Sequence, residues 1–298
     1  IAMYQAKQAG RNAIRFFDPQ MQASIEQRSR LETELRQAVQ QRQFVLHYQV
    51  QVDHDGQPLG AEILLRWHHP ERGLIAPAEF IPLAEETGLI IPIGEWLLEE
   101  ACWQLKKWER EPDRAQLHLA INVSARQFRQ PDFVERVVGM LQQTGIDPRK
   151  LKLELTESLV LDNVAEAIAT MQRLKESGVQ FSMDDFGTGY SSLAYLKKLP
   201  LDQLKIDQSF VSEIDTDPDD ATIVQTIVAM AKNLDMEVIA EGVESELQRN
   251  FLIECGCLNF QGYLFGKPLP LAEFELLLQE LAGRRKQVTP IRIGAGAQ

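Results

Sequence analysis

Acidic and amide side chains recur in or directly after short β-rich runs of this chain, where a barrel or sheet enzyme carries its functional groups. Carboxylates are rarely buried unless they are paired with a positive charge or bound to a metal. Because the carboxyl ends of parallel strands meet at one edge, we expect these side chains to converge on one site. The acidic and amide residues in this pattern are Glu62, Asn122, Glu154, Asp184, Asp185 and Glu241, and the basic Lys205 lies at the end of another of these runs.

The chemistry of this set predicts a site for divalent cations. Its carboxylates outnumber its one ammonium group, that of Lys205, and two divalent cations would neutralise the excess. Oxygen ligands without His or Cys favour Mg²⁺ or Mn²⁺ over zinc. Two metals about 3.5–4 Å apart suit phosphodiester hydrolysis, because one activates water and both stabilise charge on the phosphate and leaving oxygen. Asp184 or its neighbour Asp185 is the natural bridge between them.

Each of these residues also has an ordinary structural explanation. A single acid at a strand end often caps a helix, and a lysine is usually exposed. Recurrence of the pattern at strand after strand favours a site. Lys205 would then orient the attacking water or stabilise charge on the phosphate. Arg66 would bind a phosphate oxygen or, alternatively, form a salt bridge with a helix.

The elements that must position these residues alternate between strands and helices. Residues 96–108 and 221–234 have apolar side chains at helical spacing and predict two of the helices. The alternation predicts an α/β fold with a mainly parallel sheet, and its eightfold repetition favours a barrel over an open sheet. The predicted strands are Val45–Val52, Ala61–Trp67, Leu117–Val123, Leu151–Thr156, Gln180–Met183, Gln203–Ile206, Glu237–Ala240 and Asn259–Phe265.

The sequence predicts four segments. Residues 1–18 are too few to fold alone, and residues 19–41 are charged and helix-favouring, as in a linker helix. The barrel would occupy residues 42–282, close to the roughly 250 residues typical of such folds. Residues 283–298 are basic and then rich in Gly and Ala, which is typical of a flexible tail. The chain begins at Ile1 without an initiator Met, so we expect a fragment of a longer protein.

The charge and hydropathy of the 298-residue chain limit its partners. A net charge of -12 would repel DNA or an RNA polymer, whereas a small anionic substrate is compatible if metal ions bridge it. The most apolar stretch, residues 88–98, is far shorter than the roughly 20 residues that cross a bilayer. No signal peptide is visible. We therefore expect a cytoplasmic fragment with no membrane contact, although upstream segments could anchor the full-length protein.

Several motifs together resemble the EAL phosphodiesterases over about Arg42 to Ala282. They are Glu62-Ile63-Leu64-Leu65-Arg66, Glu154-Leu155-Thr156-Glu157-Ser158, Asp184-Asp185-Phe186-Gly187-Thr188-Gly189-Tyr190-Ser191-Ser192, Lys205-Ile206-Asp207, Ala240-Glu241-Gly242-Val243-Glu244 and Gln261-Gly262-Tyr263. The segments Ala2-Met3-Tyr4-Gln5-Ala6-Lys7 and Gly10-Arg11-Asn12 resemble the end of a GGDEF diguanylate cyclase domain. The resemblance therefore implies that the full protein is a GGDEF–EAL tandem.

This resemblance implies a TIM-like (β/α)8 barrel with an antiparallel first strand. It also implies hydrolysis of cyclic di-GMP to linear pGpG with Mg²⁺ or Mn²⁺, with Ca²⁺ as an inhibitor. Attack on one phosphate would expel the 3′ oxygen and leave the 5′ phosphate on pGpG.

The same resemblance implies a role for each matching residue. One metal would be held by Glu62, Asn122, Glu154 and Asp184, and the other by Asp184, Asp185 and Glu241, directly or through water. The catalytic residues would be Lys205, beside the attacking water, Glu241, and Glu157, which would brace the loop from Asp185 to Leu193. In the family this loop also connects to a dimer interface, so a homodimer is implied. Substrate contacts would come from Gln49, Arg66, Asp207 and Gln261.

Three positions depart from the family pattern, and none is a proposed metal ligand. Ile63 replaces the family's Ala, but neighbouring side chains of a strand point to opposite faces, so Glu62 should be unaffected. Val50 and Leu258 stand where Pro and Asp are frequent, which would tune the guanine-facing edge. The main alternative is a catalytically inactive receptor for cyclic di-GMP, and a weaker one is a barrel enzyme for another phosphodiester.

Overall fold

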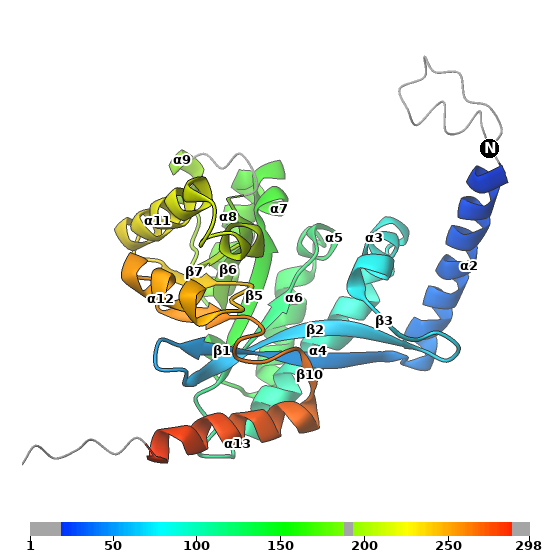
Figure 1. The fold of residues 1–298 in the computed structure, drawn as a ribbon. Coiled ribbons are helices and arrows are strands. Elements are labelled where there is room, and N and C mark those ends of the chain that lie inside the picture. Colours follow the sequence, from blue (N-terminus) through cyan, green and yellow to red (C-terminus); the bar gives the residue numbers. More distant parts are fainter. Residues whose placement is uncertain (1–18, 188–192, 288–298) are drawn as a thin grey trace, which may run out of the picture. The chain divides into compact units, whose positions relative to one another are not determined.

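A computed structural model describes residues 19–187 and 193–287 of the chain (Figure 1). The chain forms two compact units. The first comprises the chain up to Phe44 together with Arg66–Ile93, and the second comprises Val45–Leu65 and the chain from Gly94 onward. The predicted remnant of a GGDEF domain, residues 1–18, lies outside the described residues.

The first unit contains a long helix and a cluster of packed aromatic rings. Helix α2 (Pro19–Gln41) occupies the residues predicted to form a linker helix, and it packs beside α3 (Pro77–Thr87). The rings of Phe44, Trp67 and Phe80 lie with centroids 5.8–6.3 Å apart, and the Trp67 indole donates a 3.0 Å hydrogen bond to Gln43 Oε1. Strand β3 (Gly73–Ile75) pairs with the end of β2 and closes this unit.

The second unit contains most of a closed barrel. Its parallel strands are joined edge to edge from β2 to β9, and β1 closes the ring by pairing with β2 on one side and, antiparallel, with β9 on the other. The antiparallel first strand is thus confirmed. The ring strands are β1 (Phe44–Asp53), β2 (Pro58–His69), β4 (His118–Asn122), β5 (Leu151–Thr156), β6 (Gln180–Phe186), β7 (Gln203–Ile206), β8 (Glu237–Ala240) and β9 (Asn259–Gln261).

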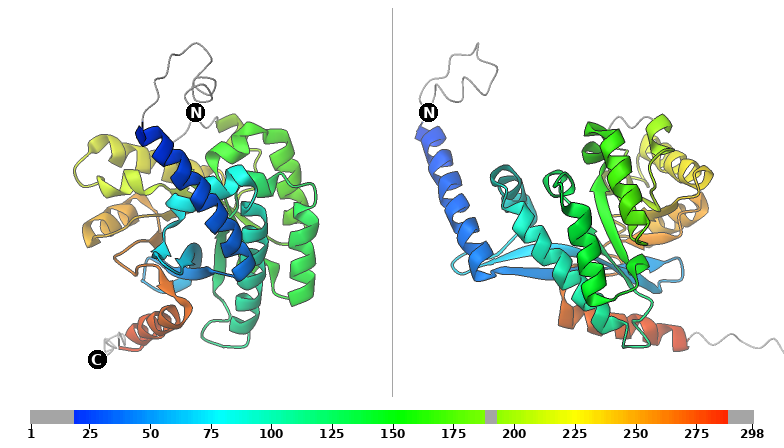
Figure 2. Two further views of the ribbon diagram at one scale, coloured as in Figure 1. Left: turned by 90° about the vertical axis from the view of Figure 1, so that its right-hand side faces the viewer. Right: turned by 180° about the vertical axis from the view of Figure 1, so that it is seen from behind.

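Helices follow the strands and cover the outside of the barrel, as both views of Figure 2 show for α6, α8 and α11. Many begin with a side-chain cap: Ser124 and Ser245 each form a reciprocal capping box with a glutamine. The helices are α4 (Ile90–Trp108), α5 (Ala125–Phe128), α6 (Phe133–Thr144), α7 (Glu157–Asp162), α8 (Val164–Lys175), α9 (Leu193–Leu196), α10 (Gln208–Ser212), α11 (Pro218–Asn233), α12 (Glu246–Cys255) and α13 (Leu271–Gln287), with a 3-10 turn η1 (Pro148–Lys150) and a short strand β10 (Leu269–Pro270).

The barrel strands bury side chains on both faces, but the two faces differ in chemistry. Apolar residues such as Leu153 and Leu204 are fully buried, and each alternates with a polar neighbour. Lys152 and Gln203 share a hydrogen bond of 3.0 Å across the strands that carry them, so the polar set faces the barrel interior. Because side chains alternate along a strand, Glu154 and Lys205, each two residues beyond Lys152 and Gln203, lie on the same inner face as this polar set.

Several element boundaries differ from the sequence prediction. Strand β6 continues to Phe186, so Asp184 and Asp185 lie within the end of the strand rather than after it. Strand β9 ends at Gln261, because the residues that follow form a turn in which Phe265 N–H bonds Gly262 O. Helix α13 extends to Gln287, beyond residue 283 where a flexible tail is predicted, since Arg, Lys and Gln are good helix formers. Residues 288–298 lie outside the described part. Within that part, no helix is both long and apolar enough to cross a membrane.

Candidate active site

Lys205 lies at the centre of a buried cluster of carboxylates. Its Nζ lies 2.6 Å from Glu154 Oε2 and from Glu241 Oε1, 3.2 Å from Asp184 Oδ1 and 3.3 Å from Glu62 Oε2. Its side chain is only 1% exposed. The strand ends therefore bring together residues that are far apart in sequence, as the sequence predicts.

Glu62 is fixed by amide donors as well as by Lys205. Asn122 Nδ2 donates to Glu62 Oε1 at 2.6 Å, and Gln261 Nε2 donates to Glu62 Oε2 at 2.7 Å. The same Gln261 amide reaches Gln49 Oε1 at 3.1 Å. The structure thus places predicted metal ligands and predicted substrate contacts in one hydrogen-bonded group.

Burial and crowding perturb the protonation of this cluster. Desolvation raises the pKa of Glu241 to about 8, although Lys205 opposes the shift. Desolvation and the nearby Glu62 carboxylate raise the pKa of Glu154 well above its usual value. Burial alone would also raise the pKa of Glu62, but Lys205 and the amide donors outweigh it and hold that pKa low. Burial opposes the charge on Lys205, yet the surrounding carboxylates raise its pKa. One ammonium therefore does not satisfy all the carboxylates.

The donor set fits a divalent cation on a second observation. Glu154 Oε1 is buried and has no hydrogen-bond partner among residues 19–187 and 193–287, although a buried acceptor without a partner is costly. A carboxylate oxygen in excess of the available protons and cations is the kind of ligand that Mg²⁺ and Mn²⁺ take. The residues that would hold such ions are the predicted Glu62, Asn122, Glu154, Asp184, Asp185 and Glu241.

An irregularity in β6 sets the positions of Asp184 and Asp185. The register with β7 shifts between Met183 and Phe186, and Asp185 has a φ of 55°, unusual for a residue with a side chain. Asp185 N–H bonds Asp184 Oδ1 at 3.0 Å. Desolvation and the neighbouring Asp184 and Asp207 raise the pKa of Asp185 to about 6. The irregularity turns two consecutive acids toward one region, where an ideal strand would send one to each face.

Glu157 and Asp207 support the segments beside the cluster. Glu157 is buried at the start of α7, and its Oε2 accepts a 3.4 Å hydrogen bond from Gly187 N–H, at the start of the predicted loop. Residues 188–192 of that loop lie outside the described residues. Asp207 caps α10 by accepting from Ser209 N–H at 2.9 Å. Its position near Asp185 makes it part of the same acidic region, whereas its predicted contact with substrate stays a prediction.

Arg66 belongs to the first compact unit, so its predicted contact with substrate also stays a prediction. The departures at Ile63 and Val50 are both packing positions, each at most 1% exposed. Ile63 is buried while its neighbour Glu62 bonds Lys205, which agrees with the expectation that they occupy opposite faces of β2. Leu258 is exposed.

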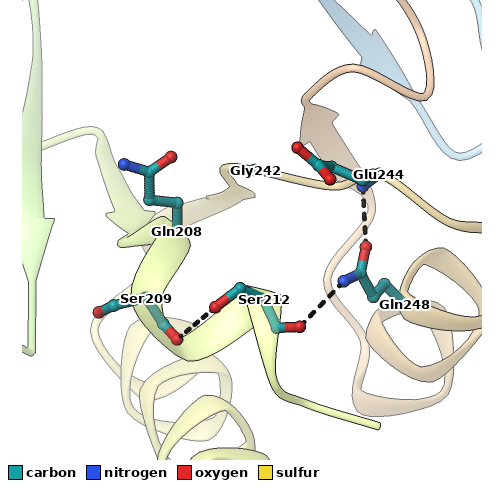
Figure 3. Close-up of a pocket in the computed structure, with 6 residues that line it drawn as sticks. All are labelled: Gln208, Ser209, Ser212, Gly242, Glu244 and Gln248. Carbon is teal, nitrogen blue, oxygen red and sulfur yellow. Dashed lines mark hydrogen bonds between the residues drawn. The ribbon is translucent and has the colours of Figure 1, made fainter.

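A cavity of about 370 Å³ opens between the segments that follow β7 and β8 (Figure 3). These segments begin directly after Asp207 and Glu241. Gln248 of α12 links them, because its Oε1 accepts from Glu244 N–H at 2.8 Å and its Nε2 donates to Ser212 O at 3.4 Å. Sequence reasoning did not identify this cavity, although each of the two segments follows a predicted strand end. Its lining residues are Gln208, Ser209, Ser212, Gly242, Glu244 and Gln248.

A different acidic group lies near the start of α11. Oxygens of Glu213, Asp217 and Asp220 lie within 4.8 Å of one another, and the first two side chains are exposed. None of them is a predicted ligand. Exposed acids of this kind are common without an ion, so the buried cluster around Lys205 is the stronger candidate.

Comparison with known proteins identifies the family. Residues 32–268 match the EAL domain. The chain belongs to the EAL domain family. This EAL chain is 47% identical over 270 residues to the bifunctional diguanylate cyclase/cyclic di-GMP phosphodiesterase MucR of Pseudomonas aeruginosa, covering 90% of this chain and 39% of MucR. It is 42% identical over 293 residues to the cyclic di-GMP phosphodiesterase NbdA of the same organism, covering 98% of this chain and 37% of NbdA.

Solved EAL structures share the fold. The MucR phosphodiesterase in complex with cyclic di-GMP has a TM-score of 0.80 and 46% identity, covering 82% of this chain and 99% of that one. An EAL enzyme with cAMP and cyclic di-GMP bound has a TM-score of 0.81 and 36% identity, covering 86% of this chain and 70% of that chain. The EAL chain described here spans less than half the length of the curated relatives MucR and NbdA.

Proposed function

We propose that this EAL domain hydrolyses cyclic di-GMP to linear pGpG with Mg²⁺ or Mn²⁺ as cofactor. The observation that carries the proposal is the buried cluster in which Glu62, Glu154, Asp184 and Glu241 surround Lys205. In the described part of the chain, Glu154 Oε1 is left without a partner there. Relatives named cyclic di-GMP phosphodiesterases and a relative solved with cyclic di-GMP support the choice of substrate.

The chain's own residues would carry the following roles. Water attacks one phosphorus atom, the bond from phosphorus to the 3′ oxygen breaks, and that oxygen takes a proton, which leaves the 5′ phosphate on pGpG. Lys205 holds its charge among the carboxylates and positions the attacking water or the phosphate oxygen. Glu241, whose oxygen lies 2.6 Å from the Lys205 ammonium, would hold a cation at the same point once its own proton is released. Two bound divalent cations would supply activation of water and stabilisation of charge on the phosphate.

The remaining predicted residues would recognise the nucleotide and shape the loop. Gln49 and Gln261, already bonded to each other beside Glu62, are placed to contact the substrate, and we assign Asp207 and Arg66 the same task. Glu157 would hold the loop of residues 185–193 through Gly187.

We further propose that the full protein is a cytoplasmic GGDEF–EAL tandem that acts as a homodimer through the region of this loop. The name of MucR, a bifunctional diguanylate cyclase and phosphodiesterase, supports the tandem arrangement.

The test is incubation of the chain with cyclic di-GMP and Mg²⁺ or Mn²⁺, followed by chromatography of the products. Metal-dependent formation of pGpG, lost with chelator and inhibited by Ca²⁺, is the expected result. Tight binding without product would overturn the proposed hydrolysis and indicate a receptor for cyclic di-GMP. Turnover of a different phosphodiester, in a panel of substrates tested alongside, would support the proposed hydrolysis but show that cyclic di-GMP is the wrong substrate.

A further inference from the structure

A line of hydrogen bonds runs through the barrel interior from the beginning of β4 to the carboxylate cluster. His118 Nε2 lies 2.8 Å from Gln51 Oε1, Gln51 Nε2 lies 2.8 Å from Gln261 Oε1, and Gln261 Nε2 lies 2.7 Å from Glu62 Oε2. The Gln51 side chain is fully buried and that of Gln261 nearly so. Two side chains with no assigned role, Gln51 and His118, thus connect to a proposed metal ligand.

The direction of every hydrogen bond in this line follows from its carboxylate end. An ionised carboxylate only accepts, so the Gln261 group that faces Glu62 must be its NH₂. The Gln261 oxygen then faces Gln51, which must present its own NH₂. The Gln51 oxygen consequently faces His118, so that Nε2 of the imidazole must carry a hydrogen. The order of donors and acceptors is therefore independent of how each amide was oriented.

The surroundings of His118 favour that single protonation state. Desolvation and the nearby Lys152 ammonium lower the pKa of His118 to about 3, so the ring is neutral at physiological pH. Gly60, on the adjacent strand β2, leaves space for it, because a Cβ there would lie 2.6 Å from His118 Cδ2. A neutral ring with a hydrogen on Nε2 is a fixed donor at the end of the line.

We propose that Gln51 and His118 are positioning residues for the phosphodiesterase site, acting through the amide of Gln261 on Glu62. This inference rests on the proposed function for its catalytic consequence. If the Gln261 amide turned over, its oxygen would face the Glu62 carboxylate, and two acceptors would repel each other. The line prevents that turn and holds Glu62 where Asn122 and Lys205 also contact it.

A double-mutant cycle tests whether Gln51 acts through Gln261. Gln51→Met removes the hydrogen bonds at nearly constant length, and we expect kcat/KM to fall by roughly three- to tenfold, the range of one net hydrogen bond. In a Gln261→Met background the same change should alter kcat/KM by less than about twofold, because the residue that it orients is absent. Calorimetric titration with Mn²⁺ alone should show a similar three- to tenfold weakening for Gln51→Met.

Ser182→Ala is the matched control. Ser182 is buried on the inner face and bonds Gln203 Oε1 at 3.3 Å, outside the line. It should lose stability without changing kcat/KM or Mn²⁺ affinity. Equal losses from Gln51→Met in both backgrounds, or equal losses from the control, would show that the interior polar groups serve only folding and would overturn the proposal.

His118 provides a second test by conservative rescue. His118→Gln retains a donor at the position of Nε2 and should keep activity and Mn²⁺ affinity within about twofold of the unchanged protein, whereas His118→Leu should reproduce the loss in Gln51→Met. Similar losses in both His118 variants would contradict an orienting role.

Ring-nitrogen magnetic resonance separates this inference from the proposed function. In the metal-free protein the imidazole signal that disappears in His118→Gln should report hydrogen on Nε2 and none on Nδ1. A hydrogen on Nδ1 would overturn the inference whether or not cyclic di-GMP is hydrolysed. Absence of turnover with hydrogen on Nε2 and weakened Mn²⁺ binding in Gln51→Met would instead retain the positioning role and reject the proposed reaction.

Discussion

The carboxylates around Lys205 hold more acceptor oxygens than the buried donors can satisfy, and Glu154 Oε1 has no partner among the residues that the structure describes. A site of this kind is stabilised by a cation and destabilised without one, because buried charges of one sign repel each other. At single residues, this excess of carboxylate oxygens affects both catalysis and the release of protons.

Glu62 and Ile63 form a matched pair for mutation because they are adjacent on β2 and face opposite sides. Glu62→Ala should abolish hydrolysis, since it removes a metal ligand and the partner of Asn122, Lys205 and Gln261. Ile63→Ala should retain turnover within a few-fold but lower the free energy of unfolding by about 2–5 kcal/mol, the usual cost of a buried Ile truncation. Product analysis and chemical denaturation measure the two effects. Near-normal hydrolysis by Glu62→Ala would remove the proposed site.

Cation binding should release protons. At pH 7 Glu241, with its pKa raised to about 8, is largely protonated in the ion-free protein, and the pKa of Glu154 is also raised. Mn²⁺ or Mg²⁺ needs the ionised oxygens, so binding at pH 7 should liberate about one proton or more, and affinity should increase from pH 6 to pH 8. Calorimetry in two buffers with different ionisation enthalpies counts the protons. A binding heat that does not depend on the buffer would contradict the perturbed carboxylates.

At the level of elements, the end of β9 and the turn after it form backbone hydrogen bonds with Val243, in the segment that carries Glu241. Val243 N–H bonds Gln261 O at 3.1 Å and Leu264 N–H bonds Val243 O at 3.0 Å. Between these contacts lies Gly262, where a Cβ would lie 2.1 Å from Val243 O. No side chain can be accommodated there unless the two segments separate.

Gly262→Ala should therefore lower both stability and activity. We expect a loss of about 1–3 kcal/mol in the free energy of unfolding, as for overpacking, and a decrease in kcat of at least about tenfold as Glu241 shifts. Gly139→Ala is the control, because Gly139 lies within helix α6 with no atom near its added Cβ and should gain about 0.5–1 kcal/mol. Thermal melts and initial rates would show the contrast. Unchanged kcat in Gly262→Ala would mean that the backbone hydrogen bonds of Val243 do not position Glu241.

The sequence predicts the elements well because each one is encoded locally. Runs such as Leu151–Thr156 and Gln203–Ile206 coincide with β5 and β7 as predicted, since short β-favouring runs are bounded by turns. The strand-end acids were predictable for the same reason. The interior polar residues Gln51, His118 and Lys152 were not, because alternation shows that two faces differ but not which face lies inside a barrel. The irregularity at Asp185 also leaves no local signal, since it arises from register with the neighbouring strand.

At the level of the whole molecule, the buried polar interior couples stability to pH. The pKa of His118 is about 3 in the folded protein against 6.5 for the free side chain, so the unfolded state binds more protons between these values. The stabilisation is complete above pH 6.5 and is lost as the pH falls, at up to about 1.4 kcal/mol per unit. The neighbouring Lys152 adds to this effect, because the charge of its ammonium opposes protonation of the ring.

Comparison of this protein with His118→Gln between pH 7 and pH 5 isolates the effect. The free energy of unfolding of the unchanged protein should decrease more steeply than that of the variant, and the difference between them should change by about 1–2 kcal/mol over that range. Parallel decreases would mean that His118 binds protons equally well in the folded and the unfolded state, contrary to the desolvation that lowers its pKa in the folded protein.

The one-way order of donors and acceptors from His118 to Glu62 has a consequence for the history of such a sequence. A substitution that reverses one member of the line, for instance by replacing a donor with an acceptor, is tolerated only if every member between it and the carboxylate is replaced as well. Positions 51, 118 and 261 are far apart along the chain, yet drift at one of them limits what the others can become. Among divergent descendants these three positions should change together, as one inherited unit.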